Sequence, residues 1–480
     1  MASATLKRRS TMDMTEGNLF LKLILFALPI MATTIMQLLY TTIDLTTVHY
    51  GASEESMGAI ASNNALINLI VVVFTNVSLG VNVILSEARG AGNKDKARKI
   101  LHTALIFAFF SGLFVGTLGF FISDNLLEMM RTEAHYMEKA TLYLRIYFCG
   151  LPFLMIYNYC AQILRAQGDS RTPFFILAIA GATNVAFDCL FVFPMHMDVA
   201  GVAIATVISE GLSAVLGILA LAKGKRGYVH LHFKQLRIDK VCLIEMLRVG
   251  LPAGLQGFFF SLPNVFIQSS LYTIEPGNVN LENGAIASAN IEGYFFAVVD
   301  AIGAATMTFI AANLGAKRTD NIKKCVLYGL AWGGMFCVLV ALATGLLYRP
   351  LLHLFVDKEE AIMAGRDRLF VMGFFYALNL LMNLSAATLR GLKKSVFPMI
   401  TTMVFCTGLR ILLILTVFPL PTFHTVTWLY SLFPITWGLA FVCNGVALAI
   451  LMPRILRRID AEKAALEAEK AQEASEVPAE

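Results

Sequence analysis

The sequence predicts an all-α polytopic membrane protein whose twelve transmembrane helices form two pseudo-two-fold related six-helix lobes. The composition is 57% hydrophobic and 15% charged, whereas soluble domains carry about 25% charged residues. Unbroken apolar runs reach the ~20 residues that cross a bilayer as a helix, without the ~10-residue alternation of barrel strands. The second half of the chain also repeats features of the first.

Hydrophobic segments and the polar turns between them define twelve expected spans. Those longer than a bilayer requires are expected to tilt, bend or project beyond it. Pro29, Pro252 and Pro263 mark expected kinks, because proline removes a backbone donor. The spans cover residues 19–48, 57–86, 100–123, 141–164, 172–193, 199–222, 244–273, 284–314, 324–348, 369–389, 396–419 and 424–452.

Repeated motifs divide the spans into two halves. Leu-Arg, seven intervening residues and then Pro occur at Leu164–Pro173 and again at Leu389–Pro398, 225 residues on. Six spans per half give both halves the same orientation, as in transporters that bind substrate and ions between or within such repeats. The expected organisation is an N-terminus at 1–18, an N-lobe at 19–222, a linker at 223–243, a C-lobe at 244–452 and a tail at 453–480.

The basic residues predict the orientation. Most of them fall in the termini and in the loops on the same side as the termini, which the positive-inside rule assigns to the cytoplasm. Both termini are therefore expected in the cytoplasm, and the net charge of +5 requires no nucleic-acid partner. Of the 38 Lys and Arg residues, six fall on the opposite side: Arg131, Lys139, Arg349, Lys358, Arg366 and Arg368.

Two acidic residues lie well inside spans of the first half, with no basic residue nearby. They are Asp44 in the first span and Asp188 in the fifth. Ionisable side chains at bilayer depth cost ~2.5 kcal/mol or more and usually mark ion or substrate pathways. Asn184 precedes Asp188 by one helical turn and shares its face. The predicted cation-coupling site comprises Asp44, Asp188, Asn184, Gln37, Asn158 and Thr206.

The coupling ion is expected to be H⁺ or Na⁺. Oxygen ligands suit a hard cation, and a Na⁺ site would comprise Asp44, Asn184, Asp188 and Thr206. Two carboxylates held together at low dielectric can instead share a proton, because desolvation and like charge both favour the neutral form. The alternative interpretation is structural: these polar groups would form hydrogen bonds between helices.

The second half carries a different set of membrane charges. Asp300 and Glu292 lie in the eighth span and Arg410 in the eleventh, whereas the equivalents of the N-lobe acids are apolar. These three residues form either a C-lobe site for substrate or charge, or an ion pair between Arg410 and one of the acids. Cation coupling is therefore placed in the N-lobe.

No cofactor, structural metal or enzymatic activity is expected. The eight cysteines form no C-x-x-C pair, and zinc-ligand spacing is absent. The sequence also lacks the D-D-x-x-D and G-x-S-x-G motifs of prenyl transferases and serine hydrolases. The 35 Phe and 21 Met residues suit a pocket for small cationic or amphipathic organic compounds, bound by a monomer in the bilayer.

A series of motifs occurs in order along the chain, at Gln37–Asp44, Ser78–Arg98, Ile163–Pro173, Asn184–Ser209, Val249–Gln256 and Thr388–Met399. Together they resemble the multidrug and toxic compound extrusion transporters, in particular the bacterial DNA-damage-inducible-type branch. The resemblance covers roughly residues 14–454 and implies Na⁺- or H⁺-driven antiport of organic cations by two six-helix lobes in the bacterial cytoplasmic membrane. It also implies a cation site at the six N-lobe residues. In members coupled through the C-lobe, acids stand where this chain has Phe260 and Asn379.

A flippase for a lipid-linked precursor is the alternative function, because related folds include such proteins. A cavity for anionic head groups would require several Arg or Lys residues. Arg410 is the one basic residue that the sequence places deep in a span, so the antiporter is preferred.

Overall fold

A computed structural model describes residues 11–51, 54–130, 132–223 and 227–476, and those residues form helices and connecting turns with no strand. The first half contains α1 (Leu19–Gly51), α2 (Glu54–Gly90), α3 (Lys94–Met129), α4 (Ala134–Ala166), α5 (Arg171–Val192) and α6 (Asp198–Lys223). The second contains η1 (Phe233–Gln235), α7 (Lys240–Ile274), α8 (Val279–Gly315), α9 (Thr319–His353), α10 (Glu359–Phe374), α11 (Tyr376–Gly391), α12 (Val396–Thr401), the π-helical η2 (Thr402–Leu409), α13 (Arg410–Thr416) and α14 (Val426–Glu476).

The prediction of twelve spans is confirmed for the described residues. Eleven helical segments are long and apolar enough to cross a membrane, and α10 with α11 supplies a twelfth that bends by 48°. The bend lies at Phe375, whose φ of −97° and ψ of 10° are not helical. The expected span at 369–389 missed the first part of this element, because the segment before it is charged yet still helical. The helices α1 and α7 continue through Pro29 and through Pro252 and Pro263.

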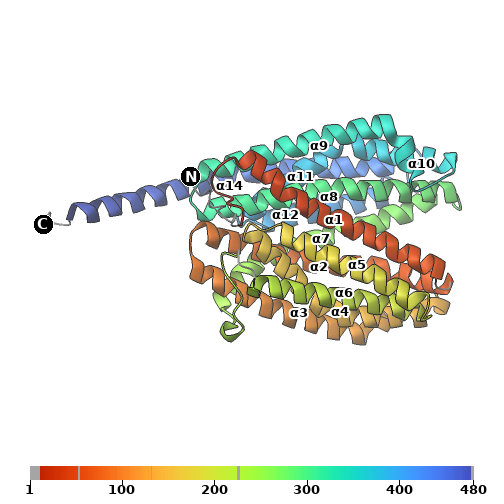
Figure 1. The fold of residues 1–480 in the computed structure, drawn as a ribbon. Coiled ribbons are helices and arrows are strands. Elements are labelled where there is room, and N and C mark those ends of the chain that lie inside the picture. Colours follow the sequence, from red (N-terminus) through yellow and green to blue (C-terminus); the bar gives the residue numbers. More distant parts are fainter. Residues whose placement is uncertain (1–10, 52–53, 131, 224–226, 477–480) are drawn as a thin grey trace, which may run out of the picture.

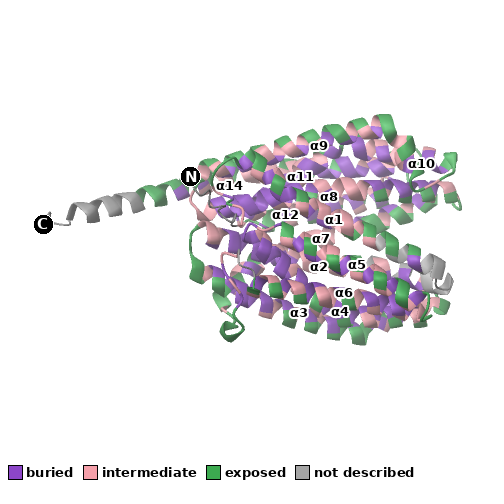
Figure 2. Cartoon of the chain, viewed as in Figure 1, coloured by how far each residue is buried: buried purple, intermediate pink, exposed green. Residues whose placement is uncertain are grey.

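The helices form two groups, with α2–α6 in one and α8–α14 in the other, and α1 and α7 lie between them (Figure 1). Exposed residues line the outer faces of α3 and α9 (Figure 2). Many of these are large and apolar: Phe114 is 69% exposed, Phe121 72% and Leu346 77%. Apolar surface of this extent needs a non-aqueous partner, and lipid on both outer faces meets that need.

The lobes meet at a glycine crossing between α2 and α8. A Cβ on Gly90 would lie 1.9 Å from the carbonyl oxygen of Ala312, and one on Gly315 would lie 1.9 Å from that of Glu87. Each pair maps onto the other through the 225-residue repeat, so the pseudo-two-fold axis passes through this crossing. Small residues allow helix backbones to approach this closely in membranes. Neither glycine can gain a side chain unless the helices separate.

Polar contacts between the lobes gather near this crossing, at the end of the molecule that carries both chain termini, here called the terminal end. Lys393 Nζ lies 3.0 Å from Glu87 Oε2, and Lys96 Nζ lies 2.7 Å from Glu245 Oε2. Deeper in the interface, Thr308 Oγ1 donates to Asn82 Oδ1 at 2.9 Å. The two lobes are thus fastened together at the terminal end.

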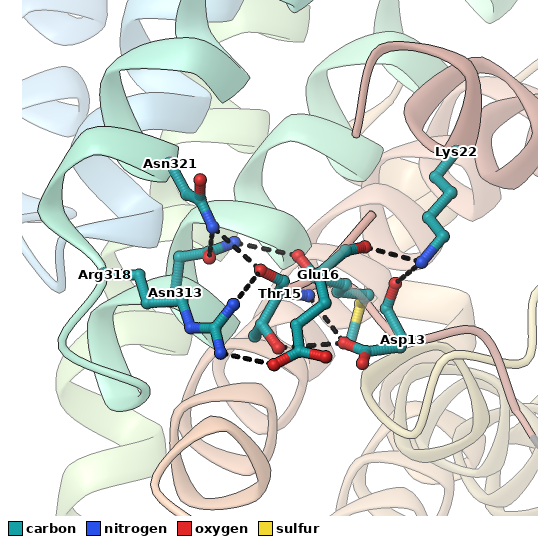
Figure 3. A network of polar contacts seen from close by, with 8 residues as sticks. Asp13, Thr15, Glu16, Lys22, Asn313, Arg318 and Asn321 are labelled. Carbon is teal, nitrogen blue, oxygen red and sulfur yellow. Dashed lines mark hydrogen bonds and ion pairs between the residues drawn. The ribbon is translucent and has the colours of Figure 1, made fainter. Parts of the chain in front are cut away.

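Residues 11–18 cross the terminal end as a strap, and Figure 3 shows its contacts with the second lobe. On the first lobe, Arg89 Nη2 donates to the Met12 carbonyl at 2.9 Å. On the second lobe, Asn313 Nδ2 donates to the Met14 carbonyl at 2.9 Å and Arg318 Nη2 lies 2.5 Å from Glu16 Oε1. The strap therefore binds both lobes in the conformation described.

Removing one strap contact should loosen the terminal end slightly. Glu16→Ala deletes the ion pair with Arg318, which is partly solvent-exposed and worth about 1 kcal/mol or less. We expect a rise of up to about fivefold in the population that is open at this end, read from spin-label distances between the lobes. An unchanged distance distribution would show that the strap follows the lobes without holding them.

Candidate functional site

The helices α1 and α5 run side by side in the same direction, and their register is fixed by a tyrosine. The Met12 amide donates to the Gly168 carbonyl at 3.0 Å, which brings the starts of both helices together. Further along, a Cβ on Gly181 would lie 1.9 Å from the Tyr40 ring, and Tyr40 Oη donates to the Ala178 carbonyl at 3.3 Å. Tyr40 therefore lies directly against α5.

This register places position 44 beside the predicted acid site. Asp44 is one turn beyond Tyr40, and Asn184 and Asp188 are one and two turns beyond Gly181. Because each residue advances a helix by about 1.5 Å, position 44 of the backbone is level with the 184–188 segment. The side chain of Asp44 lies outside the described part of the structure, so its contacts are not assigned.

The two α5 residues of the predicted site are buried. Asp188 is fully buried and Asn184 is 6% exposed. The Asn184 Nδ2 atom has no hydrogen-bond partner among the described residues. A carboxylate withdrawn from water must be compensated by hydrogen bonds, by a cation or by a bound proton. This pair on one face of α5 can thus act as an ion or proton site.

The other predicted members contact their own helices or lie near the surface. Asn158 Nδ2 donates to the Leu154 carbonyl and Thr206 Oγ1 to the Val202 carbonyl, both at 3.0 Å. Thr206 is on α6, which packs along α5. Gln37 is exposed on α1, one turn before Thr41. Among the helices that carry the predicted site residues, α1 and α6 are therefore the ones that pack along α5 beside Asp188.

In the second lobe, Glu292 and Arg410 have separate partners. Glu292 Oε2 lies 2.9 Å from Arg368 Nη2. Arg410 is fully buried, donates to Thr436 Oγ1 at 2.6 Å and stacks 4.3 Å from the Phe433 ring centroid. The sequence analysis left open a pair between Arg410 and an acid, and the described contacts assign Glu292 to Arg368 instead.

Asp300 has no ion-pair partner among the described residues, and the sequence analysis missed two arginines that act on it electrostatically. Asp300 is exposed on α8. Arg165, at the end of α4, and Arg390, at the end of α11, are both within electrostatic range of it. The repeated Leu-Arg motif contained the signal, but it was used to mark the repeat and its arginines were counted as loop charges. Span boundaries do not show in which direction a long side chain points.

Comparisons with known proteins agree with this architecture. The probable multidrug resistance protein YoeA of Bacillus subtilis is 23% identical over 415 residues, covering 84% of this chain and 87% of that protein. The probable multidrug resistance protein NorM of Thermotoga maritima is 27% identical over 398 residues, covering 80% and 82%. The structure of a MOP superfamily transporter from Pyrococcus furiosus has a TM-score of 0.84 at 19% identity, over 93% of this chain and 99% of that one.

The family model settles the assignment. The MatE model matches residues 29–190 and again residues 252–416, once in each half of the repeat. These matches cover most of the membrane helices of both lobes. The chain belongs to the MatE family of multidrug and toxic compound extrusion transporters.

Proposed function

We propose that the protein is a secondary antiporter that exports small organic compounds in exchange for H⁺ or Na⁺. The observation that carries this proposal is the fully buried Asp188, on the same helix face as Asn184 and level with position 44 of α1. A buried acid that takes up a cation from one side and releases it to the other can couple an ion gradient to substrate movement. The protein is expected to act as a monomer in the bacterial cytoplasmic membrane.

With both termini in the cytoplasm, the fastened end of the molecule is the cytoplasmic one. The conformation described is then closed to the cytoplasm at the α2–α8 crossing. A cation entering from outside would reach Asp188, and the lobes would next rock to open the cytoplasmic end. Substrate from the cytoplasm would bind as the cation leaves, and the return movement would release that substrate outside.

The identity of the ion follows from the gradient that drives transport. For Na⁺, the oxygens of Asp44, Asn184, Asp188 and Thr206 would supply the ligands. For H⁺, one carboxylate would hold the proton and be neutral when loaded. Reconstitution of the wild-type protein into liposomes allows both ions to be tested in one system.

Purified protein in liposomes should move a fluorescent organic cation against its gradient when an opposing Na⁺ or pH gradient is imposed. We expect one of the two gradients to drive accumulation and the other to have little effect. Empty liposomes supply the baseline. Dye movement that equilibrates at the same rate with and without gradients would identify a passive pathway and contradict the proposal.

The structure also favours a second candidate, a flippase for a lipid-linked precursor. The sequence analysis ranked it lower because it found one deep basic residue, whereas Arg165 and Arg390 lie within electrostatic range of Asp300. Transfer of a fluorescent anionic lipid between leaflets, with no requirement for an ion gradient, would distinguish this function from antiport.

A further inference from the structure

Arg410 is a fully buried cation whose contacts are all with uncharged groups. Its Nε and Nη2 atoms both donate to Thr436 Oγ1, at 3.2 and 2.6 Å, and its guanidinium carbon lies 4.3 Å from the Phe433 ring centroid. The Nη1 atom is buried and has no hydrogen-bond partner within the described part of the chain. An arginine does not give up its proton in a protein, so the charge remains and these contacts do not cancel it.

The ionisable groups closest to Arg410 do not neutralise it. Glu292 acts on the guanidinium electrostatically, but its Oε2 atom pairs with Arg368 Nη2 at 2.9 Å. The Cys406 thiol donates to Met382 Sδ at 3.6 Å. Arg368 and Arg410 thus oppose one carboxylate, which leaves one positive charge without a counter-ion among the described residues. A buried charge without a partner costs several kcal/mol.

Further buried donors belong to the same aromatic cluster. The ring centroid of Phe433 lies 5.7 Å from that of Trp437, which lies 6.1 Å from that of Tyr376. Trp437 and Tyr376 are fully buried, and neither Trp437 Nε1 nor Tyr376 Oη has a hydrogen-bond partner among the residues that the structure describes. Native proteins leave few buried polar atoms unpaired. Unpaired donors from three residues of one cluster favour an anionic ligand.

The backbone is irregular where it delivers Arg410 to this cluster. The π-helical η2 covers Thr402–Leu409, and α13 begins at Arg410. Turns of π-helix inside helices are frequent at functional sites. The 225-residue offset of the repeat maps Arg410 to Val185, which follows Asn184 directly. The second lobe therefore carries a buried positive charge at the level where the first lobe carries its predicted cation site.

We infer that Arg410 binds a chloride ion inside the second lobe, with Trp437 and Tyr376 in the wall of the site. A guanidinium forms charge-assisted hydrogen bonds with anions. The surrounding side chains are almost fully buried, which favours a singly charged monatomic ion, because a doubly charged oxyanion costs more to remove from water. The ion would offset the buried charge and hold α13 against α14. The inference goes beyond the proposed transport function and does not depend on which cation drives it.

Two measurements on purified protein test the inference. Thermal unfolding is compared in sodium chloride and in sodium gluconate at equal concentration, and radioactive chloride is bound by equilibrium dialysis. Since a ligand of the folded state raises the Tm, we expect a higher wild-type Tm in chloride and binding of about one ion per chain. Arg410→Gln should weaken chloride binding by roughly tenfold or more and remove the difference in Tm between the two salts.

Two further variants control for folding and for surface charge. Arg457→Gln removes an exposed arginine of α14 and should behave like wild type in both measurements. Arg410→Lys keeps the positive charge and should retain a smaller rise in Tm with chloride, which decides the question if Arg410→Gln does not fold. An equal rise in wild type and in the Arg410 variants would identify a general salt effect and overturn the inference, as would a wild-type protein that binds no chloride.

A carboxylate has the same charge as chloride, and a third salt distinguishes the two. Sodium formate replaces sodium chloride in the unfolding experiment and competes with radioactive chloride in the binding experiment. We expect chloride to raise the wild-type Tm more than formate does, and formate to displace chloride weakly. If formate stabilises the wild-type protein and chloride does not, Arg410 binds a carboxylate and the inference of a chloride site fails.

Discussion

Asp188→Asn is expected to abolish ion-driven accumulation of substrate while leaving the protein folded. The amide has nearly the same shape as the carboxylate but cannot hold a proton or neutralise a cation. Asp188 is fully buried, so water cannot take over either role. We expect gradient-driven uptake in liposomes to fall to the level of empty vesicles, while substrate binding without a gradient persists.

Two companion variants make this result specific. Asp44→Asn should have the same effect, because position 44 of α1 is level with Asn184 and Asp188 on α5. Glu128→Gln changes an exposed acid of the same lobe on α3 and should transport like wild type. Full ion-driven uptake by both aspartate variants would contradict a coupling site in the N-lobe.

Alanine at Gly90 or Gly315 should prevent the lobes from closing at the terminal end. The added Cβ would lie 1.9 Å from a backbone carbonyl oxygen of the opposite helix. A backbone atom cannot move aside by a rotamer change, as a side chain can. The conformation described would therefore become inaccessible. Because alternating access requires both conformations, we expect transport to fall at least tenfold, and to a similar extent for the two pseudo-symmetric variants.

The control for these variants is Gly334→Ala on α9, where a Cβ would meet no atom within 4 Å. In a helix, alanine is favoured over glycine by about 1 kcal/mol, so this variant should be fully active. Spin labels at Lys94 and Lys323, with Cys149, Cys189 and Cys443 replaced by Ser, report the opening. Short label distances in Gly90→Ala and Gly315→Ala, matching wild type, would contradict the proposed role of the crossing.

The sequence predicted the twelve spans and the two lobes because hydrophobic length and a repeated motif depend on local residues. It did not predict the break at Phe375, since no proline stands there and a single nearby glycine, Gly373, is tolerated within helices. The glycine crossing was missed for a different reason. Gly90 and Gly315 show their role only when two distant helices are placed in contact.

Two residues of the predicted coupling site, Asn184 and Asp188, are buried on one face of α5, and their role in coupling stays a prediction. Asp188 and Asn184 were found because polar residues are rare in apolar spans and helical spacing gives their shared face. The partners of the C-lobe charges depend on packing between helices, and the pairing of Glu292 with Arg368 could not be read from the chain. Arg165 and Arg390 were assigned to loops because hydropathy locates a backbone and not the end of a long side chain.

The most direct test of the coupling site is ion release when substrate binds to purified protein in weakly buffered solution. An antiporter with one exchangeable cation at Asp188 should release H⁺ or Na⁺ as substrate is added, and Asp188→Asn should bind substrate without release. A pH electrode and a Na⁺-sensitive dye record the two ions together. Equal release by wild type and the variant, or binding with no release by wild type, would contradict cation exchange at this residue.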